Sequence, residues 1–519
     1  MEKLRIFKLN EVFFQVETDD AGIRMELREY FSFYVPNYKW HPKVKAKIWD
    51  GRLYVYDVRT SRLPIGLFWD FFNFCDDRDY RIEFIDQEFR QELVPREPDE
   101  TDVAVLDSIP FVYGHLRDYQ MNAVVHAISN RRSIIISPTG SGKSALIYYL
   151  SLWYIQKHRR PVLVIVPTVS LVSQMAKDFH AYSKGGLPES FVHQVYSGQE
   201  KENIDHKKSP IVISTWQSVI ALDQRGRRTA GENGAFRKFL DPFGMVCLDE
   251  CHLGEAASIT RILENTVTSD HRFGFTGTLK DSKTSEMQLR GLLGGVYRTI
   301  YTHELQERKE LADLSIECHV LKYSDETRRA FSKAKFDYRK EIDFILSVDK
   351  RTEYISRLAL GLSGNTLILF QFIEKHGKRI FKKLNELRSE ETDADRKIFF
   401  ISGASPVEDR ERMREIVEKE RNAIICGSSP VLSTGVNIVN LNNVVFAFST
   451  KSQVRVIQSI GRALRVSNTK LEARLYDIVD NLSWRSRRNY TMTHALKRIE
   501  YYTEEKFKYS IKEIDFTER

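Results

Sequence analysis

A strand–loop–helix pattern over residues 133–150 constrains the fold of this chain more than any other feature. The β-branched run 133–136 predicts a strand, residues 145–150 predict a helix, and Pro138-Thr-Gly-Ser-Gly-Lys-Ser144 lies between them. Glycines let successive backbone N–H groups of such a loop turn toward a phosphate, and the helix N-terminus adds partial positive charge. A glycine-rich turn before an ordinary helix is the alternative. The order of the three parts favours phosphate binding and predicts a site for a nucleoside triphosphate.

Two side chains at the end of this loop have the chemistry that a triphosphate requires. Lys143 can reach the β- and γ-phosphates, and the hydroxyl of Ser144 can be a ligand of Mg²⁺. The other loop residues expected at the nucleotide are Thr139, Gly140, Ser141 and Gly142.

A pair of carboxylates, Asp249 and Glu250, follows the apolar run 245–248. Asp249 would hold Mg²⁺ directly or through water, and Glu250 would orient and deprotonate the attacking water. A strand that ends in an ordinary polar turn is the alternative. The upstream phosphate loop favours the catalytic interpretation.

Apolar runs separated by helical stretches occur in two successive sets, which predicts two parallel sheets covered on both faces. The predicted strands are residues 133–136, 162–166, 211–214, 245–248 and 272–275, and then 366–370, 397–401, 423–426 and 444–448. Helices are expected at 408–420 and 454–464. We therefore predict an α/β fold with two similar lobes in series.

A basic, aromatic block lies within the N-terminal region, at residues 38–52. Its alternating lysines would share one face of a strand, neutralise phosphates, and place Trp40 or Trp49 where a base can stack. A solvated strand with core tryptophans is the alternative. The residues predicted to bind nucleic acid here are Lys43, Lys45, Lys47, Trp49 and Arg52.

Composition is compatible with a polyanionic partner, because the net charge is +8. The five cysteines are scattered and odd in number, which is typical of reduced thiols and not of a disulfide framework. The chain begins with mixed charges and has no apolar run of membrane-spanning length. We expect no membrane association and a cytoplasmic location.

Short motifs in a fixed order resemble those of superfamily 2 helicases. They are His115-Leu-Arg-Asp-Tyr-Gln120, the phosphate loop, Val166-Pro-Thr168, Ser214-Thr-Trp-Gln217, Asp249-Glu-Cys-His252, Phe275-Thr-Gly-Thr278, Ser433-Thr-Gly-Val-Asn437 and Gln458-Ser-Ile-Gly-Arg-Ala-Leu-Arg465. Each motif alone is weak, and the complete ordered set is strong.

The resemblance implies two RecA-like lobes, ATP and Mg²⁺ as cofactors, and a role for each motif. Gln120 would recognise adenine, and Gly435 would also lie at the nucleotide. Arg462 and Arg465 share one helix face and would meet the γ-phosphate with Gln458; a solvent-facing pair is the alternative. The implied nucleic-acid contacts are Thr168, Thr215, Trp216 and Thr434, with Trp216 equally compatible with the core. His252, Thr276 and Thr278 would couple hydrolysis to movement, although His252 is also compatible with a buried structural histidine.

A closer resemblance links the N-terminus to the UvsW family of recombination helicases of T-even bacteriophages. It rests on Tyr30-Phe-Ser-Phe33, Ile48-Trp-Asp-Gly-Arg52, Leu63-Pro-Ile-Gly-Leu67 and the C-terminal segment 501–507. It implies an ATP-dependent DNA helicase acting on D-loops, R-loops, stalled forks and Holliday junctions in recombination, replication and repair. Implied partners are single- and double-stranded DNA, RNA–DNA hybrids, and phage recombination or single-strand-binding proteins, in the host cytoplasm. An RNA helicase and a double-strand translocase without strand separation are the alternatives.

The expected architecture has five parts. They are an α+β accessory nucleic-acid-binding domain at 1–90, an acidic linker at 91–112, an ATP-binding RecA-like lobe at 113–305, a second RecA-like lobe at 306–470 and a helical C-terminal extension at 471–519. The linker is expected because residues 86–107 are rich in Asp and Glu and contain Pro95 and Pro98.

Overall fold

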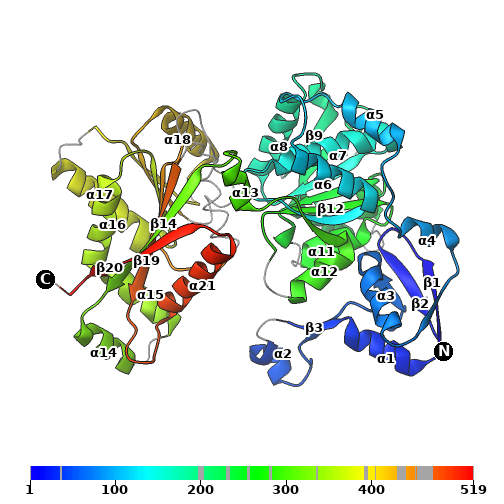
Figure 1. Cartoon of the computed structure of the whole chain (residues 1–519), viewed down its shortest axis with the longest axis horizontal. Helices are drawn as coiled ribbons and strands as arrows, with labels where there is room; N and C mark the ends of the chain where they lie inside the picture. Colours follow the sequence, from blue (N-terminus) through cyan, green and yellow to red (C-terminus); the bar gives the residue numbers. More distant parts are fainter. Residues whose placement is uncertain are drawn as a thin grey trace. The chain divides into compact units, whose positions relative to one another are not determined.

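The structure is a computed structural model in which the chain forms two compact units (Figure 1). The first unit contains residues 1–137 and 142–299, and the second contains 138–141 and 300–519. The residues described are 2–35, 38–196, 204–228, 234–253, 257–279, 283–334, 337–390, 395–403, 405–428, 440–450, 452 and 472–517.

The N-terminal region of the first unit is a small α+β domain, as predicted. Its four-stranded sheet has the order β5-β2-β1-β6. β1 pairs antiparallel with β2 and parallel with β6. The core is aromatic and includes Phe14, Phe31, Phe68, Phe71 and Phe74. The bounds are β1 Lys3–Lys8, β2 Phe13–Glu17, α1 Ala21–Tyr30, β5 Arg62–Pro64, η2 Ile65–Leu67, α3 Phe68–Asp76 and β6 Arg81–Phe84; a separate β-ribbon is formed by β3 Ser32–Tyr34 and β4 Arg52–Tyr54.

The first lobe is a seven-stranded sheet with the order β13-β7-β12-β11-β8-β10-β9, in which every pair is parallel. Alternate residues of β8 belong to two different hydrophobic cores. Val164 lies in the core that includes residues of α6 (Asp118–Asn130), α7 (Lys143–His158) and α8 (Val169–Tyr182). Leu163 lies in the core that includes residues of α9 (Trp216–Arg228), α10 (Gly234–Leu240), α11 (Ala257–Asn265) and α12 (Lys283–Leu293). All five predicted strands are confirmed. The bounds are β7 Arg132–Ile136, β8 Val162–Val166, β9 Val192–Val195, β10 Ile211–Thr215, β11 Met245–Asp249, β12 His271–Thr276 and β13 Gly295–Arg298.

Helices cover both faces of this sheet, which is why its strands are nearly all apolar. Their bounds are α6 Asp118–Asn130, α7 Lys143–His158, α8 Val169–Tyr182, α9 Trp216–Arg228, α10 Gly234–Leu240, α11 Ala257–Asn265 and α12 Lys283–Leu293. The predicted helix at 145–150 is the first half of α7.

The second unit repeats this design with the strand order β16-β17-β15-β18-β19-β14-β20, again parallel throughout. The four predicted strands are confirmed, and the predicted helix at 408–420 is α18. The predicted helix at 454–464 lies outside the described residues. The bounds include β14 Asp313–Lys322, β15 Thr366–Phe370, β16 Ile398–Ile401, β17 Ile424–Ser428, β18 Asn443–Phe446, α16 Asp349–Gly361, α17 Lys378–Glu390 and α18 Val407–Lys419.

The C-terminal residues are only partly helical, so the prediction of a helical extension needs correction. Helix α21, Tyr490–Glu504, lies in the chain between two strands, β19 at Glu472–Asn481 and β20 at Lys508–Asp515. Both strands pair with β14 and complete the second sheet. The side chain of Arg498 on α21 is buried and pairs with Asp477 on β19 at 2.7 Å. Long-range strand pairing, which local sequence does not encode, joins this segment to the lobe.

The expectation of a solvated acidic linker at 91–112 is also wrong, because the segment folds against the first lobe. Helix α5, Glu100–Ser108, begins with a capping box at Asp99. Asp102 is fully buried, accepts a hydrogen bond from Trp153 Nε1 at 2.9 Å and pairs with Arg96 at 2.7 Å. The cluster of carboxylates predicted a segment exposed to solvent. Asp102 is buried instead, because Trp153 and Arg96 provide hydrogen-bond donors for it.

In the part of the chain that the structure describes, no helix combines the length and the apolarity that crossing a bilayer needs. All five cysteines are buried and none forms a disulfide.

Candidate functional site

The predicted catalytic motifs of the first lobe meet at the carboxyl edge of its sheet. Strands β7, β12 and β11 are neighbours, and their registers pair Ile136 with Thr276 and Asp249 with Phe275. The phosphate loop, the Thr276 segment and the acidic pair therefore leave the sheet side by side. Strands β8 and β10 also end at this edge, which brings Thr168 and Thr215 to it. Loops at this edge of a parallel sheet are where α/β proteins bind ligands.

The phosphate loop leads directly into the N-terminus of α7 at Lys143. Gly140 and Gly142 both have φ of +87°, a left-handed conformation that side chains disfavour. The Lys143 Nζ donates to the backbone oxygen of Ser137 at 3.3 Å. The loop thus has the backbone geometry expected of a phosphate cradle, with its lysine folded back over the start of the loop.

Gln120, the residue predicted to recognise the base, packs against Gly142 of this loop. A Cβ added at Gly142 would lie 2.3 Å from the Gln120 Nε2, and the φ of +87° at this position also favours glycine. The Gln120 Oε1 accepts a hydrogen bond from the backbone N–H of Arg117 at 2.9 Å, which holds the amide in place.

The acidic pair sits in a site that disfavours two negative charges. Burial, and then the charge of Glu250, raise the pKa of Asp249 to about 7, while the nearby Lys143 acts in the opposite direction. The Asp249 Oδ1 accepts a hydrogen bond from the backbone N–H of Glu250 at 3.0 Å. Two carboxylates opposed by one ammonium group fit a site that takes a further cation.

The oxygen atoms of Ser144 and Asp249 are the ligand types that Mg²⁺ prefers. The Ser144 Oγ lies 2.7 Å from the hydroxyl of Tyr182, which α8 brings to the start of α7. Sequence reasoning missed Tyr182, because it belongs to no motif and its contact with Ser144 depends on how α7 and α8 pack.

A chain of polar contacts connects the acidic pair to the Thr276–Thr278 segment. The His252 Nδ1 lies 3.2 Å from the Glu250 carboxylate and 3.0 Å from the Thr276 Oγ1. The Thr276 hydroxyl donates to the backbone oxygen of Thr278 at 2.7 Å. Because that hydroxyl uses its proton on Thr278, it accepts from His252, which places a proton on Nδ1. The buried His252 therefore bridges the expected base and the expected coupling segment.

The side chains predicted to contact nucleic acid from this lobe are occupied by local structure. Thr168 caps α8 by accepting from the backbone N–H of Leu171 at 3.4 Å. Thr215 is buried and donates to the Ser218 Oγ at 3.0 Å. Trp216 is half-buried and packs against the hydrophobic core. The contacts of these three residues with a nucleic-acid strand stay predictions.

The three lysines of the N-terminal block do not alternate along a strand, so that prediction is wrong. Pro42–Lys45 forms a short helix, α2, whose first residue is proline and whose N-cap is His41. Proline suits the first position of a helix because its fixed φ matches and its missing N–H has no partner there. Lys43 and Lys45 then point to different sides, and Lys47 follows with a φ of 56°. All three lysines are exposed.

The Trp49-Asp-Gly-Arg52 segment is a turn held by its own side chains. The Trp49 Nε1 donates to the backbone oxygen of Arg52 at 2.8 Å, and Asp50 accepts from the backbone N–H of Arg52 at 2.9 Å. The Arg52 guanidinium pairs with Glu29. Gly51 has a φ of +84°, and a Cβ there would lie 2.3 Å from Tyr38. Trp49 and Arg52 therefore have structural contacts, whereas Trp40 is 74% exposed.

Three family models match successive parts of the chain. The model for the N-terminal region of the DNA helicase UvsW matches residues 6–86, that for the res subunit of type III restriction enzymes matches 114–281, and the helicase conserved C-terminal domain matches 350–467. The ATP-dependent DNA helicase uvsW of Enterobacteria phage T4 is 31% identical over 510 residues, covering 94% of this chain and 95% of that protein. The chain belongs to the UvsW family of DNA helicases. The UvsW match extends from the small N-terminal domain through both lobes.

Two solved structures complete the comparison. A crystal structure of T4 UvsW matches 99% of both chains at 28% identity, with a TM-score of 0.49. A fragment of a putative HsdR subunit of a type I restriction enzyme from Vibrio vulnificus YJ016 matches 80% of this chain and 72% of that chain at 18% identity, with a TM-score of 0.55. The second likeness shows a shared fold.

Several residues that a UvsW-family helicase is expected to use fall outside the described part of the chain. They are Thr434, Gly435, Gln458, Arg462 and Arg465. Of the expected ATP site, the described residues therefore include the part that the first lobe contributes.

Proposed function

We propose that this protein, whose T4 relative is named an ATP-dependent DNA helicase, uses ATP to remodel branched DNA. The observation that carries the proposal is the convergence of Lys143, Asp249 and Glu250 at one edge of a parallel sheet. Family membership over nearly the whole chain adds the DNA substrate. Branched substrates such as forks, D-loops, R-loops and Holliday junctions are the finer part of the proposal.

In this proposal each first-lobe residue has one task. Lys143 neutralises phosphate charge, Gln120 selects the base, and Glu250 orients the attacking water and takes its proton. Asp249 and Ser144 hold Mg²⁺, which when bound offsets negative charge on the phosphates. Tyr182 orients the Ser144 hydroxyl. From the second lobe, Gln458, Arg462 and Arg465 contribute to the same reaction, and Gly435 lies at the nucleotide.

Movement along DNA would follow from alternating grips by the two lobes. Loops at Thr168, Thr215 and Thr434 contact phosphates and sugars, which carry no direct sequence information. We therefore expect low sequence specificity. ATP binding and hydrolysis change the grip, as ligand-driven closure does in many enzymes.

The proposal is tested by comparing ATP-dependent processing of forks, Holliday junctions and RNA–DNA hybrids under the same conditions. We expect strand separation or branch movement on the DNA substrates. ATPase stimulation by RNA but not by DNA would indicate an RNA helicase instead. DNA-stimulated ATPase activity with no strand displaced from any fork would indicate a double-strand translocase.

Replacing His252 by alanine should uncouple ATP hydrolysis from the unwinding of DNA. Because His252 bridges Glu250 and Thr276 at 3.2 and 3.0 Å, its loss breaks the polar chain without removing a group that contacts ATP. We expect ATP hydrolysis to persist and fork unwinding per ATP to fall by about tenfold, the low end of the coupling free energies measured between sites. The measurement is the ratio of strands separated to phosphate released. His206→Ala, in the same lobe but away from these motifs, is the control. An unchanged ratio in His252→Ala would contradict the coupling role.

Replacing Lys43, Lys45 and Lys47 together by alanine should flatten the salt dependence of DNA binding. The lysines are exposed, and the Lys45 Nζ lies 5.1 Å from the ring of the exposed Trp40. For every lysine that neutralises a phosphate, its removal should reduce the slope of log K against log salt by about 0.9 on duplex DNA. The measurement is fluorescence anisotropy over a salt series. The exposed lysines Lys184, Lys207 and Lys208, replaced in the same way, are the control, and an equal slope in the two triple variants would refute the assignment.

A further inference from the structure

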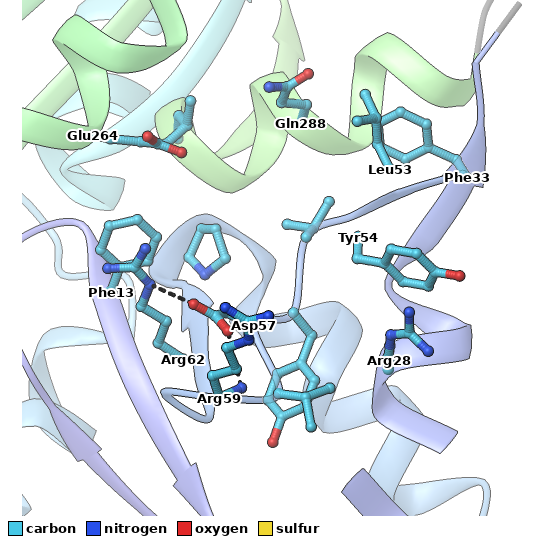
Figure 2. Close-up of a pocket in the computed structure, with 15 residues that line it drawn as sticks. Phe13, Arg28, Phe33, Leu53, Tyr54, Asp57, Arg59, Arg62, Glu264 and Gln288 are labelled. Carbon is cyan, nitrogen blue, oxygen red and sulfur yellow. Dashed lines mark hydrogen bonds and ion pairs between the residues drawn. The ribbon is translucent and has the colours of Figure 1, made fainter. Parts of the chain in front are cut away.

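A pocket of about 410 Å³ lies within the first unit where the N-terminal domain meets the first lobe (Figure 2). Its N-terminal walls include Phe13, Arg28, Tyr54 and Arg59, and helices α11 and α12 contribute Glu264 and Gln288. The volume is in the range of small-molecule sites. None of these residues belongs to the expected ATP site or to the basic, aromatic block at residues 38–52.

The two sides of the pocket are held together by direct contacts. Asp70 pairs with Arg290 on α12 at 2.8 Å. Gly66 packs so closely on this helix that a Cβ there would lie 2.0 Å from the backbone oxygen of Arg290. On the other side of the interface, Glu11 pairs with Arg132 at 2.8 Å. The pocket walls are therefore fixed relative to each other.

Flat, positively charged surfaces line the N-terminal side. The Arg28 guanidinium lies 3.9 Å from the centre of the Tyr54 ring, and that of Arg62 lies 4.6 Å from the centre of the Phe13 ring. A guanidinium group is planar, and nucleobases stack on its exposed face. The in-plane N–H groups remain available to anions.

Cations on this side exceed the carboxylates available to them. Arg62 is 3.6 Å from Asp57. In the described part of the chain, Arg28 and Arg59 have no carboxylate within ion-pair distance. An anionic group entering the pocket would therefore find two guanidinium groups without a carboxylate partner.

The opposite wall offers hydrogen-bond acceptors. Figure 2 shows Glu264 and Gln288 on the lobe side of the pocket, opposite the arginines. Gln288 donates through Nε2 to the Thr260 Oγ1 at 3.1 Å, which engages one of its two N–H donors. A carboxylate such as Glu264 accepts from the exocyclic amino group of a base.

We propose that this pocket binds one unpaired nucleotide of a DNA strand, with the base stacked on an arginine plane, its amino group facing Glu264, and its phosphate at Arg28 and Arg59. An acidic peptide also suits the arginines, but its carboxylates would meet Asp57 and Glu264. The nucleotide matches both walls. The inference rests on the proposed DNA substrate and adds a second contact with it, outside the motor motifs.

The lobe-side residues of the pocket lie on helices that follow two of the predicted motor motifs in the chain. Helix α12 is the first helix after Thr276–Thr278, and α11 is the first helix after the Asp249–His252 motif. A nucleotide in the pocket would therefore contact the helices that follow both segments.

The test uses the full chain and forked DNA with a single-stranded arm of oligo(dC) or oligo(dT), with blunt duplex as reference. We expect Arg28→Gln/Arg59→Gln to weaken binding of the oligo(dC) fork by about tenfold, the lower end of what one hydrogen bond to a charged group contributes, and to leave blunt duplex unchanged. Arg5→Gln/Arg81→Gln removes the same charge from exposed positions of the same domain and should leave both unchanged. The wild-type chain should prefer the oligo(dC) arm, and Glu264→Gln should abolish that preference.

A second readout is independent of affinity. An arm carrying 5-iodocytosine should photocrosslink to the peptide that contains Tyr54, and mass spectrometry identifies the adduct. Equal binding by the two double-arginine variants, or equal affinity for the two arms, overturns the inference. Competition by an oligoglutamate peptide without a DNA crosslink also overturns it and indicates a protein-docking site. If the wild-type chain fails to unwind any fork, the proposed function fails; if it unwinds and only these results fail, the pocket assignment alone falls.

Discussion

Replacing Glu250 by glutamine is expected to lower the rate of ATP hydrolysis by about 10²- to 10⁴-fold, the contribution of a positioned general base. Glutamine has the same shape and can still accept a hydrogen bond, but it cannot take a proton from water. The affinity for ATP should be retained, because Lys143 and the phosphate loop are unaffected. Since the charge of Glu250 helps to raise the pKa of Asp249, the substitution should also favour ionised Asp249 and so cation binding.

The decisive measurement is single-turnover phosphate release, together with equilibrium binding of a fluorescent ATP analogue. Glu189→Gln, at an exposed position of the same lobe, is the matched control and should hydrolyse ATP normally. Lys143→Ala should instead lose binding and hydrolysis together. Turnover at the wild-type rate in Glu250→Gln would sink the assignment of the base.

Replacing Arg272 by methionine should destabilise the first unit by about 3–5 kcal/mol. Arg272 is fully buried on β12. Its guanidinium donates to the backbone oxygens of Leu292 at 2.7 Å, Thr266 at 3.0 Å and Leu263 at 2.6 Å. Methionine fills much of the space but leaves these carbonyls buried without a donor, and each such loss costs about 1–3 kcal/mol.

Burying a charged guanidinium group is unfavourable, so the hydrogen bonds of Arg272 must offset the cost of its burial. Desolvation, and to a lesser extent the charge of Arg132, lower the pKa of Arg272 to about 9, so it remains protonated at neutral pH. It joins the ends of α11 and α12, the two helices that form the lobe side of the pocket. Chemical unfolding of the full chain and hydrogen exchange in α11 are the measurements. Arg237→Met, exposed on α10, is the control, and equal stability of the two variants would contradict this role.

The meeting of the first-lobe motifs at one sheet edge could be predicted from sequence because its signals are local. The spacing of Gly140, Gly142 and Lys143 and the position of Asp249 after an apolar run depend on residues adjacent in the chain. Parallel strand order then brings the ends of β7, β11 and β12 to one edge. The edge strands β9 and β13 were missed, because they are short and only partly apolar.

The N-terminal block shows why the same reasoning failed elsewhere. Alternating Lys43, Lys45 and Lys47 predicted a strand, but Pro42 begins a helical turn there. The block also indicated Trp49 and Arg52 as DNA contacts; both make internal contacts, and their binding to DNA stays a prediction. A pattern that covers only a few residues does not distinguish a strand from a short helix.

Sequence alone therefore determined the fold class, the family and which first-lobe motifs gather at one sheet edge, because motif spacing and strand–helix alternation are short-range patterns. Only the tertiary structure placed Tyr182 on Ser144, buried Arg272 among three carbonyls, and joined Arg28, Tyr54 and Glu264 around one pocket. These contacts link residues far apart in the chain. They depend on how helices and domains pack. A periodic apolar pattern indicates which face of an element is buried, but it does not show which partner that face meets.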